Sequence, residues 1–175
     1  MNIFVLDLNP MKAAQAMDCV RVPKMVVESA QMMASALRRW GATDEQMPIA
    51  KTSGKPYRGG YKHHPCTIWA GDTRANYAWL ALHALQLSTE YMKRFSKVHA
   101  CHEPIQSMVK TGMMEVKGPI GERTPFAQAM PDEYKHEDAV TAYRAYYHSK
   151  VHSAGGVHYR HTNPPDWWRG EEVIA

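Results

Sequence analysis

Cysteine is scarce in this chain, and its three residues, Cys19, Cys66 and Cys101, stand far apart with no CxxC pair. An odd number of isolated thiols argues against a disulfide framework and favours a reducing compartment. Long apolar runs are also missing, because none approaches the roughly 20 residues that span a bilayer, and no basic leader precedes the apolar stretch at the N-terminus. We therefore expect a soluble, cytoplasmic protein without a membrane partner.

Several enzyme signatures are absent too. The sequence has no P-loop, no GxGxxG and no GxSxG motif, which disfavours an NTPase, a dinucleotide enzyme and an α/β-hydrolase. His99, Cys101 and His102 cluster, and His148 and His152 lie one helical turn apart, but neither a second cysteine pair nor an HExxH motif accompanies them. We predict that the protein uses no metal and no cofactor.

Acidic residues are missing between Glu45 and Gly71, in a chain whose formal net charge is +4. The acid-free stretch contains four cations, Lys51, Lys55, Arg58 and Lys62, and closes on Tyr61-Lys62-His63-His64-Pro65. Uncompensated positive charge among Gly, Pro and aromatic residues is typical of a loop that grips a phosphate backbone. A solvated surface loop has the same composition, so both interpretations stay open.

Length and hydrophobic periodicity predict one compact, mainly α domain over residues 1–175, a helical bundle without internal repeats. Residues 2–8 are apolar and predict a buried strand or extended arm that stops at Asn9-Pro10, where a helix can begin. Two long amphipathic helices are expected at about 23–40 and about 73–95. We expect these two helices to pack against each other, with the basic loop between them.

The second half of the chain is less regular. Pro104 marks a shorter helix that Gly112 breaks, and the Gly- and Pro-rich stretch 118–125 predicts a loop. A further helix is expected at about 137–150. From about residue 151 the pattern fails, which predicts an irregular tail rich in aromatic and basic residues.

Charged residues gather around the start of the first long helix. Arg21 and Lys24 place two cations where the helix macrodipole favours an anion, which indicates a phosphate or carboxylate partner. A Lys24–Glu28 pair one turn apart with an exposed Arg21 would explain the same residues. The nearest carboxylates are Asp7, Asp18 and Glu28, and Glu28 lies among Met, Val and Ala, as a general acid or base often does. A simple salt bridge is the alternative.

The last third of the chain interleaves aromatic and basic residues, a pattern that can stack on unpaired bases while neutralising phosphates. The members are Tyr143, Arg144, Tyr146, Tyr147, Lys150, Tyr159, Arg160, Trp167, Trp168 and Arg169. Aromatic residues at helical spacing are also typical of a core. Trp167 and Trp168, which lie beyond the helical pattern, are therefore the candidates for stacking.

Three stretches carry a resemblance to a known family. They are MNIFVLDLNPMKAAQAMDCVRVPKMVVESAQ at the start, HHPCTIWAGDTRANYAWL in the middle, and TPFAQAMPDEYK followed by AYRAYY. With these stretches the chain resembles a family of small, largely phage-encoded proteins related to pyrimidine-dimer DNA glycosylase, the endonuclease V of phage. The features shared with that enzyme itself are an Arg-x-Pro-Lys helix start, a Pro-x-x-Ile before the second helix, and an aromatic, basic C-terminal region.

The resemblance implies a monomeric helical enzyme of the phage-infected bacterial cytoplasm that kinks double-stranded DNA, flips a base out and cuts its N-glycosidic bond. Its nucleophile would be the N-terminal α-amine, a group whose ordinary pKa is about 8, assisted by a glutamate at a helix start. Here Asn2 is too large for the usual removal of Met1, so Met1 would supply the amine. The position expected to hold the glutamate reads Arg21, which leaves Glu28 or Asp7 as substitutes.

We thus predict a site in two parts. The candidate catalytic residues are Met1, Asp7, Arg21, Lys24, Glu28, His63 and His64. The candidate DNA-binding residues are Lys51, Lys55, Arg58, Lys62, Arg74, Asn76, Gln128, Tyr134, Arg144, Trp167, Trp168 and Arg169.

Two other functions stay open. A scaffold that reaches an extruded pyrimidine could serve base hypermodification, by transfer of a free amino acid to a hydroxymethyluracil-type base. Asp7, Arg21, Lys24, His63 and His64 would then bind the amino acid and activate the leaving group. The second alternative is a DNA-binding protein without catalysis, whose polar residues only position phosphates.

Overall fold

The computed structural model describes residues 1–170, which form six α-helices and no β-strand. The helices are α1 Pro10–Gln15, α2 Arg21–Arg39, α3 Pro65–Asp72, α4 Arg74–Phe95, α5 His102–Lys110 and α6 Ala139–His148. Three single turns complete them, the π-helical η1 Thr111–Glu115 and the 3-10 turns η2 Asp132–Tyr134 and η3 Ser149–His152. The prediction of a mainly α fold is confirmed. Within the described residues, no helix is long and apolar enough to cross a membrane.

The two long helices begin and end where local chemistry directs them. Most of α2 is buried, with an unbroken buried run over residues 32–37, and Gly41 follows its end with a φ of +93°, a conformation that glycine adopts without strain. Helix α4 begins because the Thr73 hydroxyl accepts a hydrogen bond of 3.0 Å from the Asn76 backbone N–H. Both helices were predicted, each to within two residues of its observed ends.

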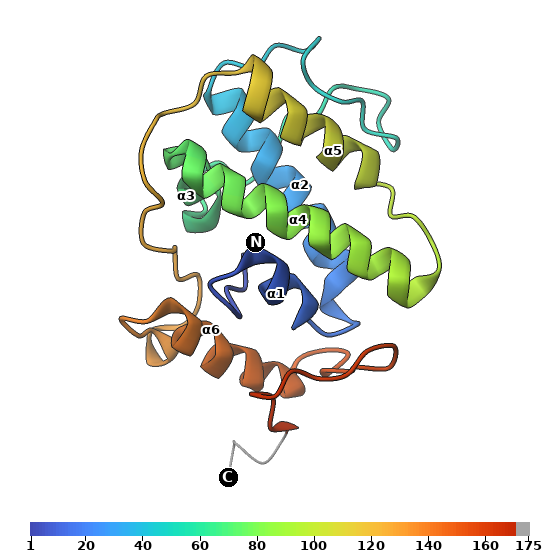
Figure 1. Ribbon diagram of the computed structural model, residues 1–175, viewed down its shortest axis with the longest axis vertical. Helices are drawn as coiled ribbons and strands as arrows, with labels where there is room; N and C mark the ends of the chain where they lie inside the picture. The colour runs from blue at the N-terminus through green and yellow to red at the C-terminus, as the bar shows by residue number, and fades with distance from the viewer. Residues whose placement is uncertain (171–175) are drawn as a thin grey trace.

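Helices α2 and α4 pack against each other in the centre of the molecule (Figure 1). Helix α1 packs on α4, α3 on α2, and α5 on both long helices. Helix α6 and the segment that follows it lie at the end of the molecule opposite α5 (Figure 1). The N-terminus is therefore enclosed between α6 and the long helices. The first residues of the chain are therefore placed in the interior of the fold.

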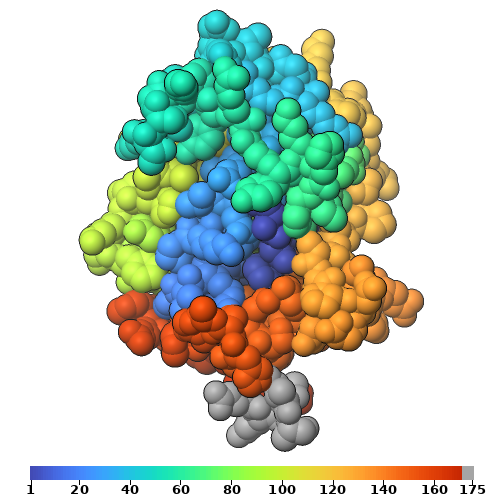
Figure 2. Space-filling view, turned by 180° about the vertical axis from the view of Figure 1, so that it is seen from behind, coloured from blue at the N-terminus to red at the C-terminus, as the bar shows by residue number. Residues whose placement is uncertain are grey.

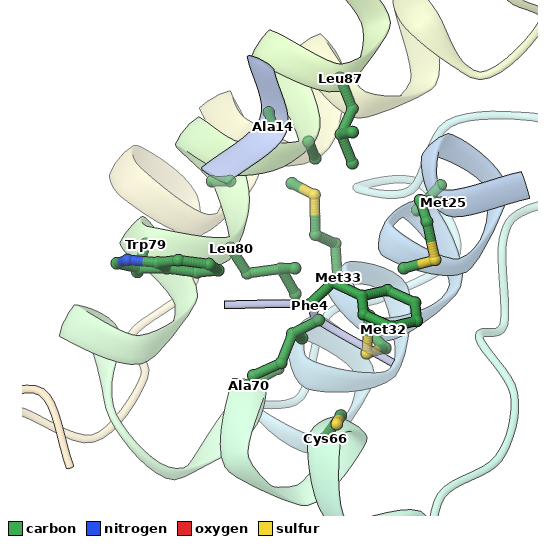
Figure 3. Close-up of a cluster of buried hydrophobic side chains, with 14 of the residues drawn as sticks. Phe4, Ala14, Met25, Met32, Met33, Cys66, Ala70, Trp79, Leu80 and Leu87 are labelled. Carbon is green, nitrogen blue, oxygen red and sulfur yellow. The ribbon is translucent and has the colours of Figure 1, made fainter. Parts of the chain in front are cut away.

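The N-terminal segment is a buried extended arm without the hydrogen-bonding pattern of a strand. Ile3, Val5 and Leu6 are completely buried, and Phe4 is held with a φ of +34°, which side-chain-bearing residues seldom adopt. The Phe4 ring lies among buried side chains of α2, α3 and α4 (Figure 3). Burial of this arm thus joins the helices into one hydrophobic core.

Two features of the middle of the chain differ from what was predicted. Residues 65–72, for which no helix was predicted, form α3 with Pro65 in its first turn, so the basic loop ends at His64. Gly112 does not break a helix but continues α5 as the π-helical turn η1. A Cβ at Gly112 would come within 2.5 Å of a carbon of the Tyr77 ring, so glycine is needed there for close packing.

His83 gives the fold a dependence on pH. The side chain is completely buried, stacks on the Trp79 ring at 5.0 Å, and neither of its ring nitrogens has a hydrogen-bond partner. Burial lowers the pKa of His83 to about 3. Because the unfolded chain takes up a proton near its ordinary pKa of about 6.5 and the folded chain does not, the free energy of unfolding should fall as the pH drops below about 6.5.

A His83→Phe variant should escape this loss. At pH 5 the wild-type protein should lose about 2 kcal/mol at this position relative to pH 8, while the variant keeps the stacking and binds no proton. Urea unfolding of both proteins at the two pH values measures the difference. The same loss of stability in both proteins would contradict the assignment.

Candidate active site

The N-terminal amine is fixed by the side chain of the next residue. The Asn2 Oδ1 accepts hydrogen bonds from the backbone N–H groups of Ile3 and Phe4, at 2.8 and 2.9 Å. The Asn2 Nδ2 donates to the Ala129 carbonyl at 3.0 Å. Because these bonds fix the backbone conformation of residues 2–4, they also fix the position of the Met1 amine beside α2.

At that place the Met1 amine meets Glu28, with 3.7 Å between the nitrogen and Oε2. The Met1 side chain is only 1% exposed although the residue as a whole is partly exposed, so the accessible atoms belong to the backbone that carries the amine. The other carboxylate oxygen, Oε1, lies 3.3 Å from Lys24 Nζ. An amine, a carboxylate and a solvent-facing ammonium group thus form one cluster.

The cluster faces a cavity of about 380 Å³, which is in the size range of small-molecule sites. Its walls come from the N-terminal arm, the first half of α2, and the end of α6 with the residues after it. Figure 2 shows the N-terminal residues, in dark blue, at the bottom of a hollow surrounded by α2, the green segment that leads into α3, and the orange segment that includes α6. The amine is therefore both enclosed and reachable.

Tyr146 and Lys150 also line this cavity, and the sequence-based list of site residues missed both. Lys150 Nζ lies 3.6 Å from the centre of the Tyr146 ring, a cation–π contact that fixes the two side chains relative to each other. The interleaved aromatic and basic pattern of residues 143–150 was the available signal. The pattern alone did not show which of its side chains face the N-terminal residues.

His64 lies at the start of α3 and is not among the residues that line this cavity. Its Nδ1 accepts a hydrogen bond of 3.2 Å from the Cys66 backbone N–H, so this histidine caps α3. Burial lowers the pKa of His64, the positive charge of the Met1 amine lowers it further, and Glu28 acts in the opposite direction. His64 is thus close enough to the amine and the carboxylate to respond to their charges. Its neighbour His63 is exposed.

Arg21 is buried, which corrects the interpretation of it as an exposed residue, and it also lines the cavity. Its guanidinium is buried, with Nη1 2.9 Å from Asp18 Oδ2 and 2.9 Å from the Gly156 carbonyl. Nη2 donates to Ser153 Oγ at 2.6 Å, and Asp18 also accepts a hydrogen bond from the Tyr147 hydroxyl. This network ties the start of α2 to the segment after α6, and so holds two walls of the cavity together.

Asp7 lies away from the amine. Its carboxylate accepts a hydrogen bond of 2.8 Å from the Asn9 backbone N–H and is 4.0 Å from Arg144. Asp7, Arg144 and Trp167 line a separate cavity of about 460 Å³. Of the two substitutes proposed for the missing glutamate, only Glu28 is beside the amine.

The basic loop contributes exposed cations next to two further cavities. Lys51, Lys55 and Arg58 border one of about 480 Å³, and Arg58 and Lys62 border one of about 300 Å³ at the end of α2. Lys51 Nζ is 3.4 Å from Glu103 and the Arg58 guanidinium is 3.9 Å from Asp44, both between exposed groups, so these ion pairs are weak. The loop cations are available to an anionic partner.

The remaining predicted DNA contacts lie in different environments. Asn76 is completely buried and its amide bonds to Trp69 and Thr124, so it cannot reach DNA. The side-chain amide of Gln128 bonds to the backbone N–H and carbonyl of His136, and the Arg74 side chain donates to the Met113 carbonyl at 3.0 Å. Both side chains thus have hydrogen-bond partners within the protein.

The aromatic residues among these predicted contacts are packed on α6. Trp168 stacks on His148 at 4.8 Å, Trp167 lies edge-on to the Tyr147 ring at 6.1 Å, and Tyr134 packs on Tyr146 at 5.4 Å. All three are partly buried, whereas Arg169 is exposed. The indoles therefore cover the core of the described structure, and Arg169 is the member of this group that solvent reaches most freely.

Chemically, the cavity combines a nucleophile with an acid–base group. A neutral amine can attack an electrophilic carbon, and a carboxylate within 4 Å can take up or return its protons. Burial raises the pKa of the Cys66 thiol to about 12, so this nearby cysteine stays protonated and does not compete as a nucleophile. Within residues 1–170, no three His, Cys, Asp or Glu side chains are grouped so as to hold a metal ion.

Comparison with known families places the chain among DNA repair enzymes. A family described as pyrimidine dimer DNA glycosylase matches residues 1–103, more than half of the 175-residue chain. The protein belongs to this family, which makes DNA the partner at the family level. The match includes Met1, Glu28 and the basic loop and ends before α6. No curated protein and no solved structure matches the chain.

Proposed function

We propose that this protein is a DNA glycosylase with lyase activity, acting on a pyrimidine nucleotide extruded from kinked duplex DNA. The observation that carries the proposal is the Met1 amine, 3.7 Å from Glu28 in a cavity of about 380 Å³. A base inside a duplex cannot reach an enclosed amine, so the nucleotide has to leave the stack. Membership of the glycosylase family supports the same reaction class.

In the proposed reaction the neutral Met1 amine attacks C1′ of the deoxyribose. The C1′–N bond breaks, and the base leaves with the electron pair and accepts a proton. Opening of the C1′–O4′ bond then gives an imine between the sugar and the protein. Removal of a C2′ proton expels the 3′ phosphate, and water hydrolyses the imine to restore the amine.

Glu28 is the group placed to move the protons of these steps. Its Oε2 faces the amine and can accept the protons that the nitrogen loses, while its Oε1 is held by Lys24. Lys24 and Lys150 add positive charge at the edge of the cavity, where the phosphates that flank an extruded nucleotide would lie. The pKa of His64, at the start of α3, is lowered by burial first and then by the charge of the amine.

Covalent trapping tests the proposed nucleophile. Borohydride should reduce the imine and link the wild-type protein to duplex DNA that contains an abasic site. Acetylation of the α-amine, or one residue added before Met1, should abolish the link, because Glu28 would then face an amide or a displaced amine. Mass spectrometry identifies the N-terminal residue and the reduced adduct.

A matched control separates this effect from lysine chemistry. Lys24→Arg keeps a cation beside Glu28 but removes the other primary amine of the cluster. This variant should still be trapped. Trapping that survives the N-terminal block and disappears in Lys24→Arg would contradict the proposal.

The same experiment distinguishes the alternatives. An amino acid transferase would form no trapped complex, but would raise the mass of hydroxymethyluracil DNA when a free amino acid is supplied. A binding protein without catalysis would do neither. No comparison supports the transferase, so the glycosylase is the function that we propose.

A further inference from the structure

Tyr61 is the only Phe, Trp or Tyr side chain in the described part of the chain that is mostly in solvent, with 67% of its surface exposed. The other Phe, Trp and Tyr rings of residues 1–170 are buried or partly covered. The tyrosine contributes little to the core, and the glycosylase reaction as proposed above makes no use of it. Its setting nevertheless indicates a function.

The backbone holds Tyr61 in an unfavourable conformation. Its φ is +53°, in the left-handed region that bulky residues rarely occupy. Glycine and asparagine are the residues that adopt this φ at low cost. The two glycines directly before it, Gly59 and Gly60, do not relieve the strain at Tyr61 itself.

Contacts on both sides keep this turn in place. Before the tyrosine, the Gly60 N–H donates to Ser35 Oγ at 2.9 Å, and the same hydroxyl donates to the Gly60 carbonyl at 3.0 Å. A Cβ at Gly59 would come within 2.2 Å of Ser35 Oγ, so the turn lies directly on α2. After the tyrosine, the His64 N–H donates to the Tyr61 carbonyl at 2.9 Å, and His64 caps α3.

These contacts place the turn that carries Tyr61 on the same helix as Glu28. Ser35 lies two turns beyond Glu28 on the same face of α2, a distance along the helix of about 10 Å. His64, three residues from Tyr61, is close enough to the Met1 amine for its charge to lower the histidine pKa. An anchored turn thus carries an exposed aromatic ring on the side of α2 where Ser35 lies, about two helical turns from Glu28.

Arg58 and Lys62 lie on either side of Tyr61 in the sequence. Arg58 and Lys62 border the cavity of about 300 Å³ together with Arg38 and Arg39 of α2. An aromatic residue between cations suits a nucleic acid, because the cations neutralise neighbouring phosphates while the ring stacks on a base.

We propose that the Tyr61 ring enters the duplex when the target nucleotide is extruded. The ring then stacks on a base that was the stacking neighbour of that nucleotide. This role rests on the proposed function, since it presumes a substrate that is extruded from DNA. The strained turn presents the ring in advance, so less conformational freedom is lost on binding. In other DNA-kinking proteins, apolar side chains enter base steps and partly unstack them. The ring of Tyr61 offers an apolar face of the same kind.

A fluorescent pyrimidine at the target position of a mismatched duplex tests the proposal without any chemical step. The wild-type protein should raise its emission on binding, because extrusion unstacks the base. Tyr61→Ala should reduce the extruded fraction about tenfold, and Tyr61→Phe, which keeps the ring, should match the wild type. The salt dependence of binding should stay the same in Tyr61→Ala, since the substitution removes no charge.

Controls keep this test separate from folding and from the glycosylase proposal. Ile120→Ala removes another side chain that is 94% exposed and should leave the emission unchanged. Failure of the wild-type protein to form the borohydride adduct would contradict the glycosylase and leave the emission result valid. Equal emission with Tyr61→Ala and wild type, or a loss with Tyr61→Phe as large as with Tyr61→Ala, would overturn the role of Tyr61.

Discussion

Replacing Glu28 by Gln should lower the rate of strand cleavage at an abasic site by about 100-fold or more, the usual contribution of a positioned acid–base group. The substitution keeps the size of the side chain and leaves the Met1 amine in place. The 3.7 Å contact would remain, but an amide cannot take up a proton from the amine or from C2′. Single-turnover cleavage of a duplex that contains one abasic site measures the effect.

Borohydride trapping distinguishes a lost proton acceptor from a damaged fold. Because the amine is untouched, the Glu28→Gln protein should still form the adduct, only more slowly. Glu122→Gln, a change at an exposed glutamate on the loop before α6, should cleave and be trapped like the wild type. Cleavage by Glu28→Gln at the wild-type rate would show that this carboxylate does not move the protons.

Removing the buried partner of Arg21 should have the largest effect on stability. In Asp18→Ala the guanidinium would stay buried without its carboxylate, a change that costs about 3–5 kcal/mol in proteins. The Tyr147 hydroxyl would lose its acceptor in the same change. Urea unfolding at neutral pH measures the loss, and cleavage should fall with it because Arg21 holds two walls of the cavity together.

An exposed ion pair provides the matched control. Glu103 is 73% exposed, and its Oε2 lies 3.4 Å from the Nζ of Lys51, which is 64% exposed. Because water screens this pair, Glu103→Ala should cost less than about 1 kcal/mol. Similar losses in the two variants would mean that burial does not set the strength of the Asp18–Arg21 pair.

The long helices could be predicted because their signals are local. Apolar spacing, Pro23 and Gly41 marked α2, and Thr73 marked the start of α4. Helix α3 was missed because its cap is a histidine and its eight residues include Gly71, so neither a usual cap nor a clear period was visible. Signals carried by neighbouring residues were sufficient for most of the fold.

The site was only partly predictable, because its decisive contacts join distant segments. Met1 and Glu28 were both candidates, yet their proximity depends on the path that the Asn2 hydrogen bonds impose. The burial of Arg21 depends on residues 150–156, which no local pattern relates to the start of α2.

The cavity is formed by two parts of the chain, of which the glycosylase family matches only the first. Its amine and carboxylate lie within residues 1–103, which the glycosylase family matches, whereas the wall formed by Tyr146 and Lys150 lies beyond that match. The two parts are also joined, because the Arg21 guanidinium bonds to the Lys150 carbonyl, Ser153 and the Gly156 carbonyl. The amine and the carboxylate therefore act in a cavity whose shape depends on a segment outside the matched range.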